Sequence, residues 1–239
     1  MSQPSEPPPL YIGCLISLHE QQAALKLIAD SVAQQRQTAS RALIFNPILL
    51  SFLAACLAAA HYSSSDIGNM LIIYPGIVLT YLVAVRYFTS AYIRIAEETK
   101  WAKWAKNDIL IGARFGEDIV GAVVMRLQRK LETEYVEDST GWETGEAFMK
   151  MPPRAIIRGW TTKTRYRGRG LGGDMLGKSV EIAKERMGRN CRVDFAKDHA
   201  NSHMPLYTIF NGPFLEREAK AKRALGAKLK DWEKKNPWR

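Results

Sequence analysis

The stretch that decides the fold is TRYRGRGLGGDMLGKSVEIAKE (Thr164–Glu185), in which a glycine-rich loop leads into a helix with one apolar face. RAIIRGWTTKT (Arg154–Thr164) before it has the composition of a strand, and the helix is expected over Leu171–Gly188. Glycines let backbone N–H groups approach a ligand closely, and a helix start adds unpaired donors and a positive dipole end. Three arginines add charge that suits a phosphate: Arg165, Arg167 and Arg169. The segment therefore predicts a pyrophosphate cradle, the alternative being a flexible loop with solvated arginines.

The glycine spacing alone does not identify the ligand. Gly168, Gly170 and Gly173 match the G-x-G-x-x-G pattern of dinucleotide-binding folds. Such a loop is expected in the first βαβ unit of a parallel sheet, whereas this one follows two strands, Ile109–Phe115 and Ile119–Leu127, joined by a short turn and therefore antiparallel. The context argues against a dinucleotide fold.

Composition excludes several classes of protein. The chain has 239 residues, 46% of them hydrophobic and 24% charged, which is far from disordered or collagen-like composition. Three scattered cysteines (Cys14, Cys56 and Cys191) are too few for a disulfide scaffold. The net charge of +10 is local: residues 154–239 hold 21 Lys and Arg against 9 Asp and Glu, and the rest of the chain holds 13 against 15. Because no stacking or recognition module accompanies this charge, a nucleic-acid partner is not favoured.

Two apolar runs have the length of membrane-spanning helices. ALIFNPILLSFLAACLAAAHY (Ala42–Tyr62) and IGNMLIIYPGIVLTYLVAV (Ile67–Val85) contain no Asp, Glu, Lys or Arg, and Ser63–Asp66 separates them. A helix of about 20 apolar residues crosses a bilayer core. We expect a transmembrane hairpin inserted at residues 42–94, with spans at about 42–62 and 67–87; the alternative is a pair of buried helices in a soluble protein.

Flanking charges predict the orientation of this hairpin. Arg36 and Arg41 precede the two apolar runs, and three basic residues follow them: Arg86, Arg94 and Lys100. The connecting turn carries only Asp66, so the positive-inside rule places both flanks in the cytosol. The start, MSQPSEPPP, is polar and proline-rich and does not resemble a signal peptide. We expect a two-pass protein, in an endomembrane, with its soluble part facing the cytosol and its cysteines reduced.

The soluble segments predict an α+β (mixed α/β) fold. In addition to the elements above, we expect a strand over Leu10–Leu18, a helix over Glu20–Gln37, a helix over Ala91–Lys106, a strand beginning at Cys191 and a charged helix over Glu216–Lys235. Leu131–Met149 is acidic and has no Lys or Arg, so it is either a solvated loop or a source of a general base.

The glycine loop resembles motif A of the GNAT superfamily of acetyl-CoA-dependent N-acetyltransferases, R/Q-x-x-G-x-G/A. Arg167–Gly172 fits this motif, and Arg165–Gly170 is a second literal register. The element order is similar to that family over residues 10–214, and the apolar insert is similar to that of its membrane-anchored branch. The resemblance implies a mostly antiparallel sheet flanked by helices, after a disordered start at 1–9 and before a basic helical tail at 215–239.

The resemblance also implies ligands and site residues. Acetyl-CoA would be the cosubstrate and an amine the acceptor. Loop residues would bind the pyrophosphate, and the preceding strand would line the pantetheine arm and thioester: Trp160, Thr161, Thr162, Arg167, Arg169, Gly170, Leu171, Gly172 and Gly173. In the family a tyrosine protonates the departing thiolate, and Tyr207 in NSHMPLYTIFNGPF (Asn201–Phe214) occupies a similar position. The alternative for Tyr207 is a core residue.

Other roles are less specified by the sequence. Candidate general bases for the amine are Asp194, Glu143 and Glu146. His199, His203 and Cys191 form only a weak metal pattern, and no metal is expected. The family normally ends with two more strands, whereas this chain ends in a basic helix. An alternative function is therefore a non-catalytic GNAT-like membrane adaptor that binds a protein partner or acidic membrane lipid through its tail.

Overall fold

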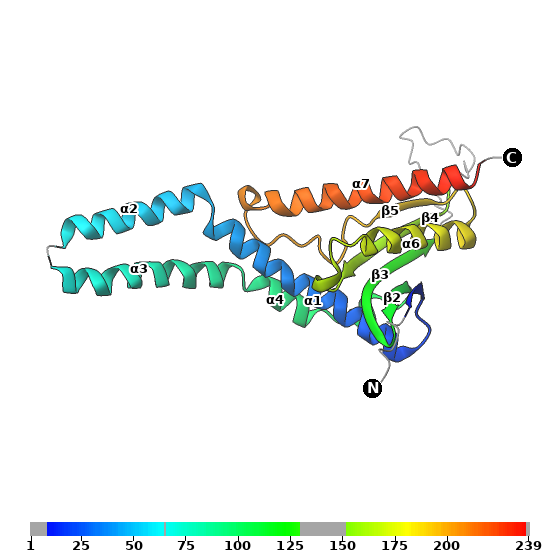
Figure 1. Ribbon diagram of the computed structural model, residues 1–239, viewed down its shortest axis with the longest axis horizontal. Helices are drawn as coiled ribbons and strands as arrows, with labels where there is room; N and C mark the ends of the chain where they lie inside the picture. Colours follow the sequence, from blue (N-terminus) through cyan, green and yellow to red (C-terminus); the bar gives the residue numbers. More distant parts are fainter. Residues whose placement is uncertain (1–8, 65, 130–151, 238–239) are drawn as a thin grey trace, which may run out of the picture. The chain divides into compact units, whose positions relative to one another are not determined.

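The computed structural model describes residues 9–64, 66–129 and 152–237. They form two compact units, each described separately (Figure 1). The sheet unit comprises Met1–Leu27, Ala105–His199 and Lys222–Arg239, and the helical unit comprises Ile28–Trp104 and Ala200–Ala221. Two long helices, α1 (Leu18–Ile44) and α7 (Gly212–Lys235), contribute residues to both units.

The sheet unit contains a five-stranded sheet in the order β1-β2-β3-β4-β5. Its strands are β1 (Leu10–Cys14), β2 (Ile109–Phe115), β3 (Asp118–Gln128), β4 (Arg154–Thr162) and β5 (Arg192–Phe195). Neighbouring strands are antiparallel except β4 and β5, which are parallel because α6 (Leu171–Met187) connects them. This arrangement confirms the α+β fold class and the mostly antiparallel sheet. The expected first strand is shorter than predicted, since β1 ends at Cys14 and α1 already begins at Leu18.

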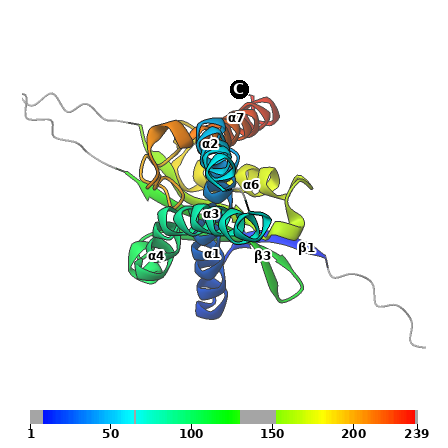
Figure 2. The same ribbon diagram turned by 90° about the vertical axis from the view of Figure 1, so that its left-hand side faces the viewer.

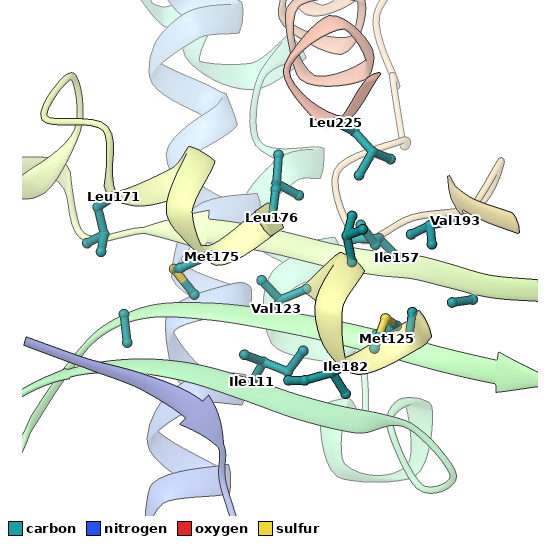
Figure 3. Close-up of a cluster of buried hydrophobic side chains, with 14 of the residues drawn as sticks. Ile111, Val123, Met125, Ile157, Leu171, Met175, Leu176, Ile182, Val193 and Leu225 are labelled. Atoms are coloured by element: carbon teal, nitrogen blue, oxygen red, sulfur yellow. The ribbon is translucent and has the colours of Figure 1, made fainter. Parts of the chain in front are cut away.

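One face of the sheet packs against α6 (Figure 3). Ile111, Val123 and Ile157 project from three different strands and are fully buried with Met175 and Leu176 of α6. The apolar residues of α6 recur at helical spacing, which explains why this segment forms a helix on the sheet. Gly188, with φ of 90°, ends α6 because glycine adopts positive φ without strain.

The C-terminal helix α7 is more than a solvated tail. Its second half belongs to the sheet unit, and Leu225 lies in the same buried cluster as Leu176. Trp232 packs against this cluster, and its ring lies under the Lys184 ammonium at 5.1 Å and the Arg189 guanidinium at 5.7 Å. The predicted basic helix is therefore present, and an apolar seam along it completes the core of the sheet unit.

The helical unit contains an apolar hairpin of α2 (Pro47–Ser63) and α3 (Ile67–Phe88), seen from the side in Figure 1 and end-on in Figure 2. Two short helices follow, α4 (Ala91–Glu98) and α5 (Trp101–Trp104), in place of the one helix expected over Ala91–Lys106.

The first apolar run is divided between two helices. Residues 42–44 end α1, and α2 begins only at Pro47. The side chain of Asn46 accepts hydrogen bonds from the N–H groups of Ile48 (3.0 Å) and Leu49 (3.4 Å), so Asn46 caps α2. A helix of 17 residues is about 26 Å long, at the short end of the range for a bilayer span, while the 22 residues of α3 reach about 33 Å.

The hairpin exposes its apolar side chains. None of the residues of α2 is buried, and Val85 is the single buried residue of α3. Among the described residues, the continuous stretch Ile67–Glu98 is long and apolar enough to cross a membrane, and α1 with α2 would be a second only if this pair, bent by 56°, counts as one span. The exposure contradicts the alternative of two buried core helices.

Candidate functional site

Strands β4 and β5 separate in front of the glycine loop. Their ladder runs from the Arg154/Arg192 pair to the Ile157/Phe195 pair, and the Ala196 N–H then donates to the Ile157 carbonyl at 2.9 Å. The ladder between β3 and β4 continues five residues further, to Thr162. Beyond Ile157, β4 therefore has no strand partner within the described chain on the side away from β3. Alternate backbone N–H and C=O groups on that side are available to a ligand.

A break in the β3–β4 register lies where this open edge begins. Val124 pairs with Gly159 and Met125 pairs with Ile157, so Arg158 is an extra residue in β4. Its guanidinium lies 2.5 Å from Asp108 Oδ2, and Arg126 Nε lies 2.6 Å from Oδ1 of the same carboxylate. The Asp108 side chain is fully buried. Sequence reasoning missed this cluster, although an arginine within an apolar strand is a signal for it.

The loop between β4 and α6 depends on two glycines with positive φ. Gly168 has φ of 78° and Gly170 has φ of 85°, a conformation that other residues adopt only with strain. A short 3-10 turn, Thr164–Tyr166, precedes them, and the Arg167 Nε donates to the Thr162 carbonyl at 3.0 Å. Arg167 therefore fastens the loop to the end of β4. A Cβ added at either glycine would meet nothing within 4 Å, so the space beside the loop is open.

The first turn of α6 offers backbone donors. The N–H groups of Gly173 and Asp174 bond to the Gly170 carbonyl at 2.8 and 3.2 Å. The N–H groups of Leu171 and Gly172 precede any acceptor within the helix and are the donors that an anion would use. Asp174 in this turn opposes an anion electrostatically, but its Oδ1 lies 3.4 Å from Lys228 Nζ, which offsets part of its charge.

Trp160 attaches the open strand to this helix. Its indole Nε1 donates to the Gly172 carbonyl at 3.1 Å, and its ring is partly buried against the core. A Cβ on Gly172 would lie 2.9 Å from Trp160 Cζ2. The side chains of Thr161 and Thr162 are also buried, so what this part of β4 offers to a ligand is the alternate backbone groups on its open edge.

The charged residues of the loop differ in their surroundings. Arg165 donates to the Tyr166 hydroxyl at 2.9 Å and its guanidinium lies 5.0 Å from the Tyr166 ring centroid. Arg169 is exposed beside Gly170. Arg169 is therefore the loop arginine best placed to reach an anion at the start of α6.

The letters GGDMLGKS (Gly172–Ser179) also match the phosphate-loop pattern of nucleoside triphosphatases. That motif requires a loop before a helix, whereas all eight residues already lie within α6. Lys178 pairs with Glu181 at 2.7 Å, and the buried Ser179 hydroxyl donates to the Met175 carbonyl. The structure therefore excludes a triphosphate loop here.

The predicted catalytic residues lie in different parts of the chain. Asp194 is exposed on β5 in the sheet unit, opposite Ile156 in the ladder. Tyr207 belongs to the helical unit, precedes the 3-10 turn Thr208–Phe210 and is 78% exposed. This exposure contradicts the alternative that Tyr207 is a core residue. Glu143 and Glu146 lie outside the described residues, so the roles of all four remain predictions.

The weak metal pattern gains no support. Cys191 is buried in the core cluster, and His199 stands edge-on to the Phe195 ring at 6.5 Å. Within the described ranges no three His, Cys, Asp or Glu side chains lie close enough together to hold a metal ion.

Comparison with known families matches part of the chain to an acetyltransferase model. The sequence model described as "Acetyltransferase (GNAT) family" matches residues 80–209, more than half of the 239 residues. This range includes β4, the glycine loop and α6. A comparison with curated proteins gives no match.

Three solved structures show distant similarity. An integron cassette protein from V. cholerae is 12% identical with a TM-score of 0.31, over 48% of this chain and 52% of that one. Two aminoglycoside acetyltransferases from uncultured soil samples are 16% and 13% identical with TM-scores of 0.32 and 0.29, over 77% and 56% of this chain and 78% and 64% of theirs. This chain thus spans about half the length of the cassette protein. At these identities and TM-scores, the family rests on the sequence model alone.

Proposed function

Because the chain belongs to the acetyltransferase (GNAT) family, we propose that it is a membrane-anchored enzyme that transfers the acetyl group of acetyl-CoA to an amine. One observation carries the proposal: the open edge of β4 leads directly into a loop that contains two glycines with positive φ, and this loop ends at the start of α6. The edge fits an extended amide-containing arm, and the loop fits a pyrophosphate. The residues present therefore suit coenzyme A.

The reaction needs little covalent chemistry from the protein. A neutral amine attacks the thioester carbonyl, the C–S bond breaks, the new N–H⁺ loses a proton to a base, and the thiolate gains one from an acid. Backbone N–H groups of the β4 edge would polarise the carbonyl. We assign the acid to Tyr207 by resemblance, and keep Asp194 and Glu146 as candidate bases. The acceptor amine is tested with a panel of polyamines, amino-acid conjugates and lysine peptides.

Calorimetric titration of acetyl-CoA into the full-length protein in detergent tests the site. Gly170→Ala strains a backbone with φ of 85° and Arg169→Ala removes the exposed loop charge, so each is expected to weaken binding about tenfold or more. Two matched controls lie on α7: Gly226→Ala, where a Cβ meets nothing within 4 Å, and the exposed Arg217→Ala. Both are expected to bind like wild type. Absence of binding by the wild type contradicts the proposal.

Turnover separates the enzyme from the adaptor alternative. An enzyme releases CoA with at least one amine of the panel, and this release falls in the Arg169→Ala variant. A protein that binds acetyl-CoA but shows no turnover with any amine is better explained as an adaptor. In that case the basic surface of α7 is the region in which to search for a partner.

The membrane anchor is supported by exposed apolar side chains. In α2 and α3, Phe52, Leu71 and Ile72 are 66%, 72% and 76% exposed, a surface that water disfavours strongly and hydrocarbon does not. With the flanking arginines, this surface supports a two-pass anchor whose ends face the cytosol.

An engineered glycosylation acceptor around Ser64 tests this topology. Acceptors at Ser64 are expected to be modified in a eukaryotic membrane system, whereas acceptors after residue 215 are not. Extraction of the protein by alkaline carbonate, with no modification at Ser64, would contradict the anchor.

A further inference from the structure

Three arginines line one cavity in the helical unit. One of them precedes the apolar hairpin in the sequence, and the other two come at its end or after it. The volume of the cavity is about 330 Å³. Arg36 comes from α1, Arg86 from the last turn of α3 and Arg94 from α4, while Ser90, Ile93 and Glu97 complete the lining. In the sequence, Arg36 and Arg86 are separated by both apolar helices. The fold brings them to the same end of the hairpin.

The position of this cavity is fixed by buried contacts around it. Tyr92 of α4 and Ala39 of α1 are completely buried in one cluster with Val85 of α3. The Ser40 hydroxyl donates to the Thr89 hydroxyl at 3.3 Å, which joins α1 to the junction of α3 and α4. The arginines therefore stand on three helices that pack together, so the cavity does not require a ligand to form.

The charge of the cavity lacks compensation. Neither the three arginines nor Glu97 makes an ion pair within 4.0 Å with any other described residue. The lining residues, three arginines and one glutamate, carry a formal charge of +2. Guanidinium groups bind phosphate through paired, charge-assisted hydrogen bonds, and their mutual repulsion decreases when an anion lies between them. The lining therefore selects an anion with several acceptor oxygens.

Apolar surface next to the cavity indicates which anion. In the last two turns of α3, Val83, Tyr87 and Phe88 are 55%, 75% and 57% exposed, immediately beside Arg86. A free phosphate makes no use of this surface, whereas a lipid covers it with its acyl chains. At the end of a membrane-spanning helix the headgroup region is also where a phosphate is found.

We propose that this cavity binds the phosphate group of an anionic phospholipid and so holds the hairpin at a fixed depth. The proposal rests on the membrane anchor proposed above, and it is independent of the coenzyme A site. It also differs from binding of lipid by the basic tail, because α7 contributes no residue to the lining.

The test uses full-length protein in a neutral detergent, titrated with short-chain phosphatidylglycerol. Neutral micelles remove the general attraction of basic residues to an anionic surface. Arg86→Gln and Arg94→Gln each remove charge-assisted hydrogen bonds and are expected to weaken binding about tenfold. Arg41→Gln is the matched control, because Arg41 is an exposed arginine of α1 that is absent from the lining, and it is expected to change binding less than about twofold.

Three results would overturn the proposal: no binding by the wild type, equal weakening by Arg41→Gln, or displacement of the lipid by inorganic phosphate at a similar concentration. The last result identifies a phosphate site without a role for lipid. Glycosylation at Ser64 in the same variants separates this failure from failure of the anchor. If Ser64 is modified but lipid does not bind, the anchor stands and the headgroup site alone is wrong.

Discussion

The indole Nε1 of Trp160 donates a hydrogen bond to the Gly172 carbonyl at 3.1 Å, which joins the C-terminal part of the open strand β4 to the first turn of α6. This contact determines where the helix start lies relative to the strand edge. Both parts of the proposed coenzyme A site, the edge and the helix N-terminus, depend on it.

Gly172→Ala is expected to disturb this contact. The added Cβ would lie 2.9 Å from Trp160 Cζ2 inside a packed region, so the free energy of unfolding should fall by about 1–3 kcal/mol. Gly226→Ala on α7 is the control, and it should be neutral or slightly stabilising because its Cβ meets nothing within 4 Å. Denaturant unfolding measures both. The double variant Trp160→Phe, Gly172→Ala should lose less stability than the two single losses added together, and simple additivity would show that the clash is not the cause.

Asp108 is expected to stabilise the fold at the bulge of β4, where it pairs with Arg158. Its carboxylate is fully buried between Arg126 and Arg158, and Asp108→Asn leaves the Arg158 charge without its ion pair to this carboxylate. Removing one partner of a buried ion pair costs about 3–5 kcal/mol. Asp118→Asn, which breaks the exposed 3.4 Å pair with Lys163, should cost less than about 1 kcal/mol. Equal losses of stability in the two variants would contradict this assignment.

Leu225 tests whether α7 is part of the fold. It is 4% exposed in the core cluster, so Leu225→Ala should reduce the free energy of unfolding by about 2–5 kcal/mol. Leu215 on the same helix is 51% exposed, and Leu215→Ala should have an effect of about 0.5 kcal/mol or less. If both variants unfold at the denaturant concentration of the wild type, the second half of α7 does not pack on the sheet unit.

The thiol of Cys191 should react slowly. Burial raises the pKa of this thiol, so the reactive thiolate is less populated at any given pH, and its side chain is 1% exposed. Cys14 is half-buried and is expected to react before Cys191 with iodoacetamide at pH 8. Peptide mass spectrometry resolves the two sites, and the difference should disappear in denaturant. Faster labelling of Cys191 than of Cys14 in the folded protein would contradict the core assignment.

Local patterns predicted much of the sheet unit. The β-favouring composition of β2 and β3, the glycines at 168 and 170, and the apolar face of α6 each depend on neighbouring residues, so the sequence indicates them directly. The break at Asn46 was missed because the apolar run continues through it, and only the Asn-Pro pair signals a new helix start. The seam of Leu225, Leu229 and Trp232 has helical spacing but is hidden among many lysines.

Contacts between distant segments could not be predicted in this way. Asp108 and Arg158 are 50 residues apart, and Arg36 and Arg86 are joined in one cavity only by the packing of α1 against α3 and α4. Neither pair leaves a periodic pattern in the sequence. The charge flanking the hairpin leads us to expect these arginines on one side of a membrane, but it gives no indication that they line one cavity.

Amide hydrogen exchange of the full-length protein with and without CoA tests the central claim most directly. The account predicts that peptides covering residues 159–176, from the open edge of β4 to the first turn of α6, exchange more slowly when CoA is bound. Peptides from the second half of α7 should not change. Protection confined to α7 or to the hairpin, with residues 159–176 unaffected at saturating CoA, would contradict the account.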